Sequence, residues 1–156
     1  MASVIAVGHG STLTFSTFAA PIRSIGGFTQ DREAVDAGHL SMEGYTKKVP
    51  AGLAEPGSFE CELIFDPNAS TTSGTSASTD YRVGHGIPDP TGAAAACVVT
   101  FPAGGNTTSA ALVSGTAFCT SWTSPELTSD GLMTGTMTLQ WQGGGSNVFT
   151  WTAAGA

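Results

Sequence analysis

Histidine is the residue of this sequence best suited to metal binding or proton transfer, and it occurs three times. His9, His39 and His85 each follow a glycine, in the contexts GHG, GHL and GHG, and none forms a recognisable zinc motif with a nearby cysteine or histidine. Histidines from distant loops can still converge on one ion, so two interpretations stay open: a metal site, or hydrogen-bonded residues in turns.

The cysteines offer a second kind of chemistry, through thiolate nucleophiles or disulfides. Cys61, Cys97 and Cys119 are widely spaced and form no CxxC pair. Each lies in an apolar strand pattern, where a free cysteine behaves as a small hydrophobic residue. We therefore expect three reduced thiols in the core.

Other catalytic patterns are missing from the sequence. It contains no G-x-S-x-G elbow, no glycine-rich phosphate loop and no dinucleotide fingerprint. Glu60 and Glu62 share one strand face, but paired glycosidase carboxylates require a facing partner across a cleft. We expect a wet anionic strand face, no enzymatic activity and no cofactor.

Composition favours a single β-rich domain covering residues 1–156. The chain has 21 Gly, 8 Pro, 40% hydrophobic and only 11% charged residues, with a formal net charge of −7. No apolar run approaches the roughly 20 residues of a membrane-spanning helix. We therefore expect no membrane insertion. The five cations are scattered, whereas nucleic-acid binding needs clustered cations, so we expect no specific DNA binding. They are Arg23, Arg32, Lys47, Lys48 and Arg82.

Two segments show the period-two alternation of a half-buried strand. In Ser58–Phe65 the apolar residues alternate with Ser58, Glu60 and Glu62, and Asp66-Pro67-Asn68 ends the strand. In Leu132–Trp141 they alternate with threonines. The predicted core residues are Phe59, Cys61, Leu63, Phe65, Met137, Leu139 and Trp141.

Other strands are predicted with less regular patterns, and turns separate them about every ten residues. About eight short strands with at most one short helix indicate a small β-sandwich or barrel. The remaining predicted strands are 4–7, 12–18, 22–28, 93–101, 110–122 and 148–152.

Two long connections interrupt this pattern. Residues 30–57 are rich in glycine, proline and charge, and DREAVDAGHLSMEG within them has room for one helical turn. A loop of this length is usually functional or disordered, and we expect it to become ordered on assembly. Residues 68–92 form a polar loop or crossover ending in the turn signal PDPTG.

Several segments, in this order, resemble the major tail protein of long-tailed bacteriophages, the subunit of the tail tube. They are PIRSIGGF, VDAGHLSMEGYTKKVPAGLAEPG, SFECELIFDPN and SDGLMTGTMTLQWQGG. The resemblance covers residues 20–68 and 125–152. Across 69–122 the family commonly carries a helix, whereas the sequence here, NASTTSGTSASTDYRVGHGIPDPTG, is unfavourable for a helix.

The resemblance implies a structural virion protein whose hexameric rings stack into a tube for genome ejection. It implies contacts with other copies of itself and with tape-measure, tail terminator and tail-tip proteins, in a phage tail assembled in the host cytoplasm. DNA would pass through without specific binding. The candidate lumen lining is Glu60, Glu62 and Asp66. The candidate inter-ring residues are Asp31, Arg32, Glu33, Asp36, His39, Met42, Tyr45, Lys47 and Lys48.

Two alternatives stay open from the sequence. One is a related virion protein, such as a tail terminator or a head-decoration protein. The other is a carbohydrate-binding or adhesive β-sandwich module, with sugars stacking on aromatic residues. Its candidate aromatic residues are Tyr45, Tyr81, Trp122, Trp141 and Trp151, although the apolar register of Trp141 and Trp151 favours a place in the core.

Overall fold

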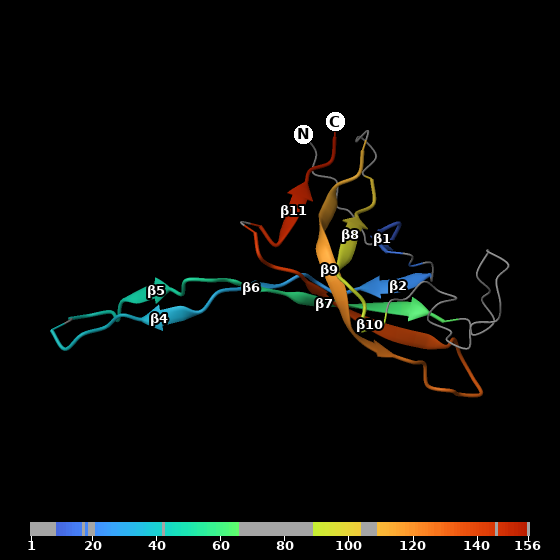
Figure 1. Ribbon diagram of the computed structural model, residues 1–156, viewed down its shortest axis with the longest axis horizontal. Coiled ribbons are helices and arrows are strands. Elements are labelled where there is room, and N and C mark those ends of the chain that lie inside the picture. Colours follow the sequence, from blue (N-terminus) through green and yellow to red (C-terminus); the bar gives the residue numbers. More distant parts are fainter. Residues whose placement is uncertain are drawn as a thin grey trace.

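The computed structural model describes residues 9–16, 18, 21–41, 43–65, 89–103, 109–145 and 147–155. These residues form β-strands and connections without any helix (Figure 1). No helix of a length and apolarity that could span a membrane occurs among them. The strands are β1 (Thr12–Phe15), β2 (Ile22–Ile25), β3 (Gln30–Asp31), β4 (Ala34–Asp36), β5 (Lys48–Pro50), β6 (Glu55–Pro56), β7 (Ser58–Ile64), β8 (Ala95–Thr100), β9 (Leu112–Thr123), β10 (Thr134–Trp141) and β11 (Phe149–Thr152).

Most strands belong to one antiparallel sheet in the order β1-β8-β9-β10-β7-β2, in which β11 also pairs with β9. The long strand β9 divides this sheet into two layers. Its first half, up to Ala117, pairs with β8 and β11, and from Ala117 onward it pairs with β10. The first layer therefore contains β1, β8, the start of β9 and β11. The second layer contains the end of β9, β10, β7 and β2 (Figure 1).

The core lies between these layers, and it confirms the strand alternation predicted from the sequence. All seven predicted core residues, on β7, β10 and the position after β7, are buried. The first layer supplies the opposing side chains Leu13, Phe15, Cys97, Val99, Val113, Ala117 and Phe149, and Cys119 joins the core from the end of β9 in the second layer. The threonines between the core positions of β10 stay half-exposed on the outer face.

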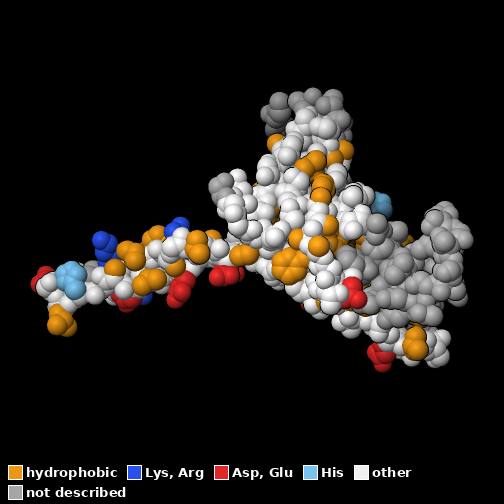
Figure 2. All heavy atoms as spheres, in the orientation of Figure 1, with side chains coloured by type: hydrophobic (Ala, Val, Ile, Leu, Met, Phe, Trp, Pro, Cys, Tyr) orange, Lys and Arg blue, Asp and Glu red, His pale blue; other side chains and the backbone are white. Residues whose placement is uncertain are grey.

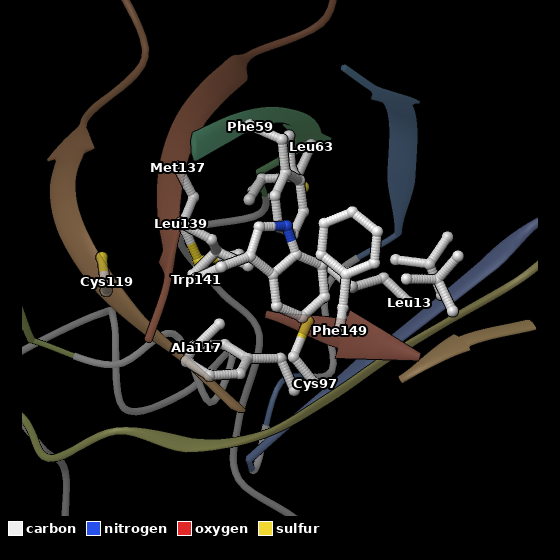
Figure 3. Close-up of a cluster of buried hydrophobic side chains, with 14 of the residues drawn as sticks. Leu13, Phe59, Leu63, Cys97, Ala117, Cys119, Met137, Leu139, Trp141 and Phe149 are labelled. Carbon is white, nitrogen blue, oxygen red and sulfur yellow. The ribbon is translucent and has the colours of Figure 1, made fainter. Parts of the chain in front are cut away.

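Trp141 joins the two layers at the centre of this core. Its ring centroid lies 5.2 Å from that of Phe59 on β7 and 5.1 Å from that of Phe149 on β11 (Figure 3). Gly115 on β9 makes room for the indole, because an added Cβ would lie 2.9 Å from Trp141 Cζ3. A glycine inside an apolar strand thus marks the place where a large ring crosses the backbone.

The three cysteines confirm their predicted role as core residues. All three are buried thiols. Burial raises the pKa of Cys61 to about 12, and burial together with the neighbouring Cys61 raises the pKa of Cys97 to about 12. Such thiols stay protonated and inert at neutral pH.

The core position that the sequence favoured for Trp151 is wrong, because this residue is 60% exposed. It follows Phe149 on the same face of β11, and it stacks on Phe101 with ring centroids 5.6 Å apart. The second layer does not cover this end of β11, where Trp151 instead lines an open groove. The alternation therefore predicted the correct face of β11 for Trp151, but the opposing layer does not extend far enough to cover it.

Three predicted features fall wholly or partly outside the described residues. The strand at 4–7 and Asp66 lie outside them, as does the connection from 68 to 88. The end of that connection is described and forms the predicted turn, in which Asp89 accepts hydrogen bonds from the backbone N–H groups of Thr91 and Gly92.

Candidate functional site

The connection between β2 and β7 forms an arm, residues 30–56, that projects far from the two layers (Figure 1). It is a two-stranded antiparallel ribbon in which β3 pairs with β6 and β4 pairs with β5. Backbone hydrogen bonds from Ala51 to Glu33 and from Ala37 to Lys47 continue the pairing between and beyond these ladders. The segment has room for one helical turn, but residues 34–36 form a strand instead and the described residues around them contain no helix.

The base of the arm is fastened to the second layer. Gln140 on β10 donates from Nε2 to the carbonyls of Pro56 and Gly57, and the Trp141 N–H donates to Gly57 O at 3.1 Å. The backbones of Gly57 and Thr29 also approach so closely that a Cβ on Gly57 would overlap Thr29 O. A two-stranded ribbon is only marginally stable alone, so these contacts set the direction of the arm.

Several predicted inter-ring residues stabilise the arm itself. Asp36 accepts a hydrogen bond from Gly38 N at 2.8 Å and forms an ion pair with Lys48 at 3.3 Å. Arg32 Nε donates to Ala51 O at 2.6 Å across the ribbon. Exposed ion pairs contribute little to stability, so the backbone ladders carry most of the arm's order.

The remaining predicted residues of the arm are exposed to solvent. Asp31, Glu33, His39, Tyr45 and Lys47 all have exposed side chains, and His39 Nδ1 lies 2.9 Å from the Ser41 hydroxyl. Met42 lies outside the described residues. The arm therefore presents most of the predicted set together.

Apolar side chains on the arm are the feature that sequence reasoning missed. The accessible surface areas of Leu40, Tyr45 and Leu53, relative to the fully exposed residue, are 109%, 96% and 85%, and that of Val35 is 44%. Figure 2 shows hydrophobic side chains along the whole arm, interleaved with charged ones. Exposed apolar side chains gathered on one projecting element make the arm a candidate surface for contact with another molecule. The signal in the sequence was an isolated apolar residue every few positions in a polar segment.

Glu60 and Glu62 lie on the outer face of the second layer, as their alternation with the core predicted. Their cross-strand neighbours are Thr138 and Thr136 on β10. Arg23 on β2 lies 3.6 Å from Glu62, so this carboxylate is partly neutralised. The polar face is thus rich in hydroxyl groups and carries less net negative charge than the two glutamates alone imply.

The second layer also has two open edges among the described residues. β2 ends the sheet on one side, and no described strand pairs with the outer edge of β9 at residues 120–123. Unpaired strand edges are templates for association with another chain.

Among the described residues, those of the alternative functions are not brought together. Trp141 is fully buried, Trp122 packs against Phe65 in the second layer, and Trp151 is on β11. Tyr45 is on the distant arm, and Tyr81 lies outside the described residues. His9 lies beside β1 whereas His39 is on the arm, and His85 also lies outside the described residues.

The described residues thus form a two-layer antiparallel domain with a projecting ribbon and open sheet edges. The sequence matches no protein-family model and no curated protein. Solved structures do share the fold. One is a chain in the sheath/tube terminator of an extracellular contractile injection system, PVC, with a TM-score of 0.66 and 12% identity, covering 98% of this chain and 100% of that one.

Two further structures extend this comparison. A chain in the tube terminating cap of the anti-feeding prophage has a TM-score of 0.65 and 16% identity, covering 99% of this chain and 95% of that one. A chain in the tail of an empty GTA particle has a TM-score of 0.53 and 19% identity, covering 86% and 84%. The chain therefore has the fold of phage-tail-type proteins, in agreement with the β-sandwich predicted from the sequence.

Proposed function

We propose that this chain is a structural, non-enzymatic tail subunit that forms hexameric rings stacked into a tube. The observation that carries the proposal is the arm, which extends exposed apolar side chains away from a folded body. The shared fold supports it, because the similar chains come from structures of a terminator, a cap and a tail.

The open edges of the second layer support a closed ring. Successive strands from β9 through β10 and β7 to β2 are antiparallel, so β2 runs opposite to β9. When copies are arranged head to tail around an axis, β2 of one copy meets residues 120–123 of the next in the antiparallel sense. This joins the sheets into one barrel and removes the edges. Two structures with this fold were determined with six-fold symmetry, the anti-feeding prophage baseplate and the GTA tail, which supports six copies in a ring.

The arm supports stacking of one ring on the next. It lies outside the two layers, so its apolar side chains can be buried only against another molecule. Burying a leucine-sized side chain is worth about 1.5–3 kcal/mol, and six arms in each ring would add their contributions.

The polar face of the second layer is the proposed wall of the channel. Threonine hydroxyls with Glu60 and Glu62 offer a polyanion few attractive contacts, and symmetry would repeat the carboxylates around the axis. DNA would then pass without binding, as expected of a phage tail in the virion. Replacing both glutamates with lysine should permit assembly but slow genome ejection, and normal ejection kinetics would exclude a role in the channel.

Deleting the arm tip, residues 37–47, tests the stacking directly. We expect the variant to fold and to form single rings, whereas the full chain forms tubes, in negative-stain electron microscopy. Gly52→Ala, which keeps the arm and has no atom within 4 Å of an added Cβ, is the control for stacking of rings. Tubes of normal length from the deletion variant would contradict the proposal.

A tail terminator is the second candidate, because two of the similar chains come from a terminator and a cap. In this role the chain would form one ring that closes a tube, and it would not polymerise on its own. Full-length protein that stops at single rings and binds the end of a preformed tube would favour this function. The tube-subunit proposal, in contrast, includes assembly around a tape-measure protein, contacts with a tail tip and assembly in the host cytoplasm.

A further inference from the structure

An open groove lies between β2 and the first layer, away from the arm, and it borders the polar face at Arg23, whose ion-pair partner is Glu62. Its volume is about 720 Å³, which is within the range of about 300–1,000 Å³ of ligand-sized pockets. Ile22, Ile25 and Phe28 line one side, and Val99, Phe101 and Trp151 line the other. The groove is therefore a concave apolar surface that the fold leaves uncovered by the described residues.

The charge of the groove favours an acidic occupant. Arg23 and His9 line it, and none of its described lining residues is a carboxylate. The Arg23 side chain remains 58% exposed even though it pairs with Glu62. An occupant that combines apolar side chains with carboxylates would match both the walls and the cation.

The loop between β9 and β10, residues 124–133, has this combination. Leu127 and Leu132 are 86% and 69% exposed. Glu126 and Asp130 lie beside them, and the chain contains no Lys or Arg after Arg82. The loop has a defined turn, because Thr128 Oγ1 donates to Asp130 O at 2.7 Å and Gly131 has a φ of 93°. Little conformational entropy would be lost when this turn is buried.

We propose that this loop of one copy docks in the groove of the neighbouring copy in the ring, with Leu127 buried and an acidic side chain near Arg23. The inference rests on the proposed ring. In that ring β9 residues 120–123 pair with β2 of the neighbour, and the loop begins at the next residue. Since β2 is also a wall of the groove, edge pairing brings the loop to the mouth of the groove. The arm fits less well, because its carboxylates are interspersed with three of the five cations, Arg32, Lys47 and Lys48, whereas the loop carries carboxylates and no cation.

A photo-crosslinking experiment on assembled full-length protein tests this contact. Leu127 is replaced by p-benzoylphenylalanine, and Leu53 on the arm receives the same probe as a control. The probe at 127 should yield adducts between two copies that map to residues 22–28, 99–102 or 151, and the probe at 53 should not. Adducts elsewhere, or rings without adducts, would overturn the inference while leaving the proposed ring in place.

A matched substitution measures the energetic side of the contact. Leu127→Asp should leave the circular dichroism of the dilute protein unchanged, because the side chain is exposed. It should raise the concentration at which half the protein is in rings by about tenfold or more. Assembly at the concentration of the unchanged protein would overturn the inference. If the unchanged protein forms no rings at any concentration, the proposed function fails first and this inference fails with it.

Discussion

Replacing Gly57 with alanine should weaken the junction between the arm and the body. In the native structure a Cβ at this position would lie 1.7 Å from Thr29 O and 2.6 Å from the Thr29 carbonyl carbon. Both atoms belong to the backbone, so no side-chain rotation relieves the overlap. The two segments must move apart by more than about 1 Å before the methyl group reaches a tolerable distance.

The expected loss of folding stability follows from the contacts at this junction. Overpacking costs about 1–3 kcal/mol, and each weakened hydrogen bond to Gly57 O, from Trp141 N and Gln140 Nε2, costs about 0.5–1.5 kcal/mol. A total near 3 kcal/mol corresponds to a fall in Tm of roughly 6–12 °C for a chain of this length. The direction of the arm changes as well, so tube formation should fall more than the stability of the body.

Thermal melts of the dilute protein and electron microscopy of the concentrated protein measure these two effects. Gly52→Ala is the matched control, because it lies in the arm with no atom within 4 Å of an added Cβ. It should change stability by less than about 0.5 kcal/mol and leave tubes intact. Equal melting and equal tube formation in both variants would refute the account of the junction.

Leu139→Ala, at a fully buried site, should lower the free energy of unfolding in urea by about 2–5 kcal/mol, whereas Thr138→Ala on the outer face should cost less than about 1 kcal/mol. The reverse ranking would mean that the faces of β10 are inverted. Cys61 and Cys97 should resist a thiol reagent at pH 8 until the protein is unfolded, and labelling of the native protein would contradict their burial. Their pKa is raised from 9.0 to about 12 in the folded state, so the unfolded state loses these protons first as the pH rises. The contribution of these protonated thiols to the free energy of unfolding should be fully present below pH 9. It should then fall toward pH 12 by about 1.4 kcal/mol per pH unit for each thiol. Equal stability in urea at pH 8 and pH 10 would contradict this expectation.

The strands that build the core could be predicted because their signal is local. In Ser58–Ile64 and Thr134–Trp141 one face is buried and the other is wet, so each residue reports its own side through its polarity. The order of the strands in the sheet is set by contacts between distant segments and has no comparable local signal. Met133 shares the alternation of Met137 and Leu139 in the sequence, but it is only half-buried because it precedes the first residue of β10.

The arm could not be predicted as a ribbon for a physical reason. Both faces of β4 and β5 are largely exposed, so no apolar alternation develops and the ladder depends mainly on backbone hydrogen bonds. The anchoring of its base depends on Gln140 and Pro56, which are 84 residues apart in the chain. Exposed apolar residues such as Leu40 and Leu53 were visible in the sequence, but their meaning emerges only once the arm is seen to project from the body.

The most direct test of the central claim is electron cryomicroscopy of the full-length protein at high concentration. The account predicts rings of six copies stacked into tubes, with the second layers joined around a channel and each arm in contact with the next ring. Glu60 and Glu62 should face the channel. Protein that stays monomeric, or rings whose arms contact no other ring, would contradict it.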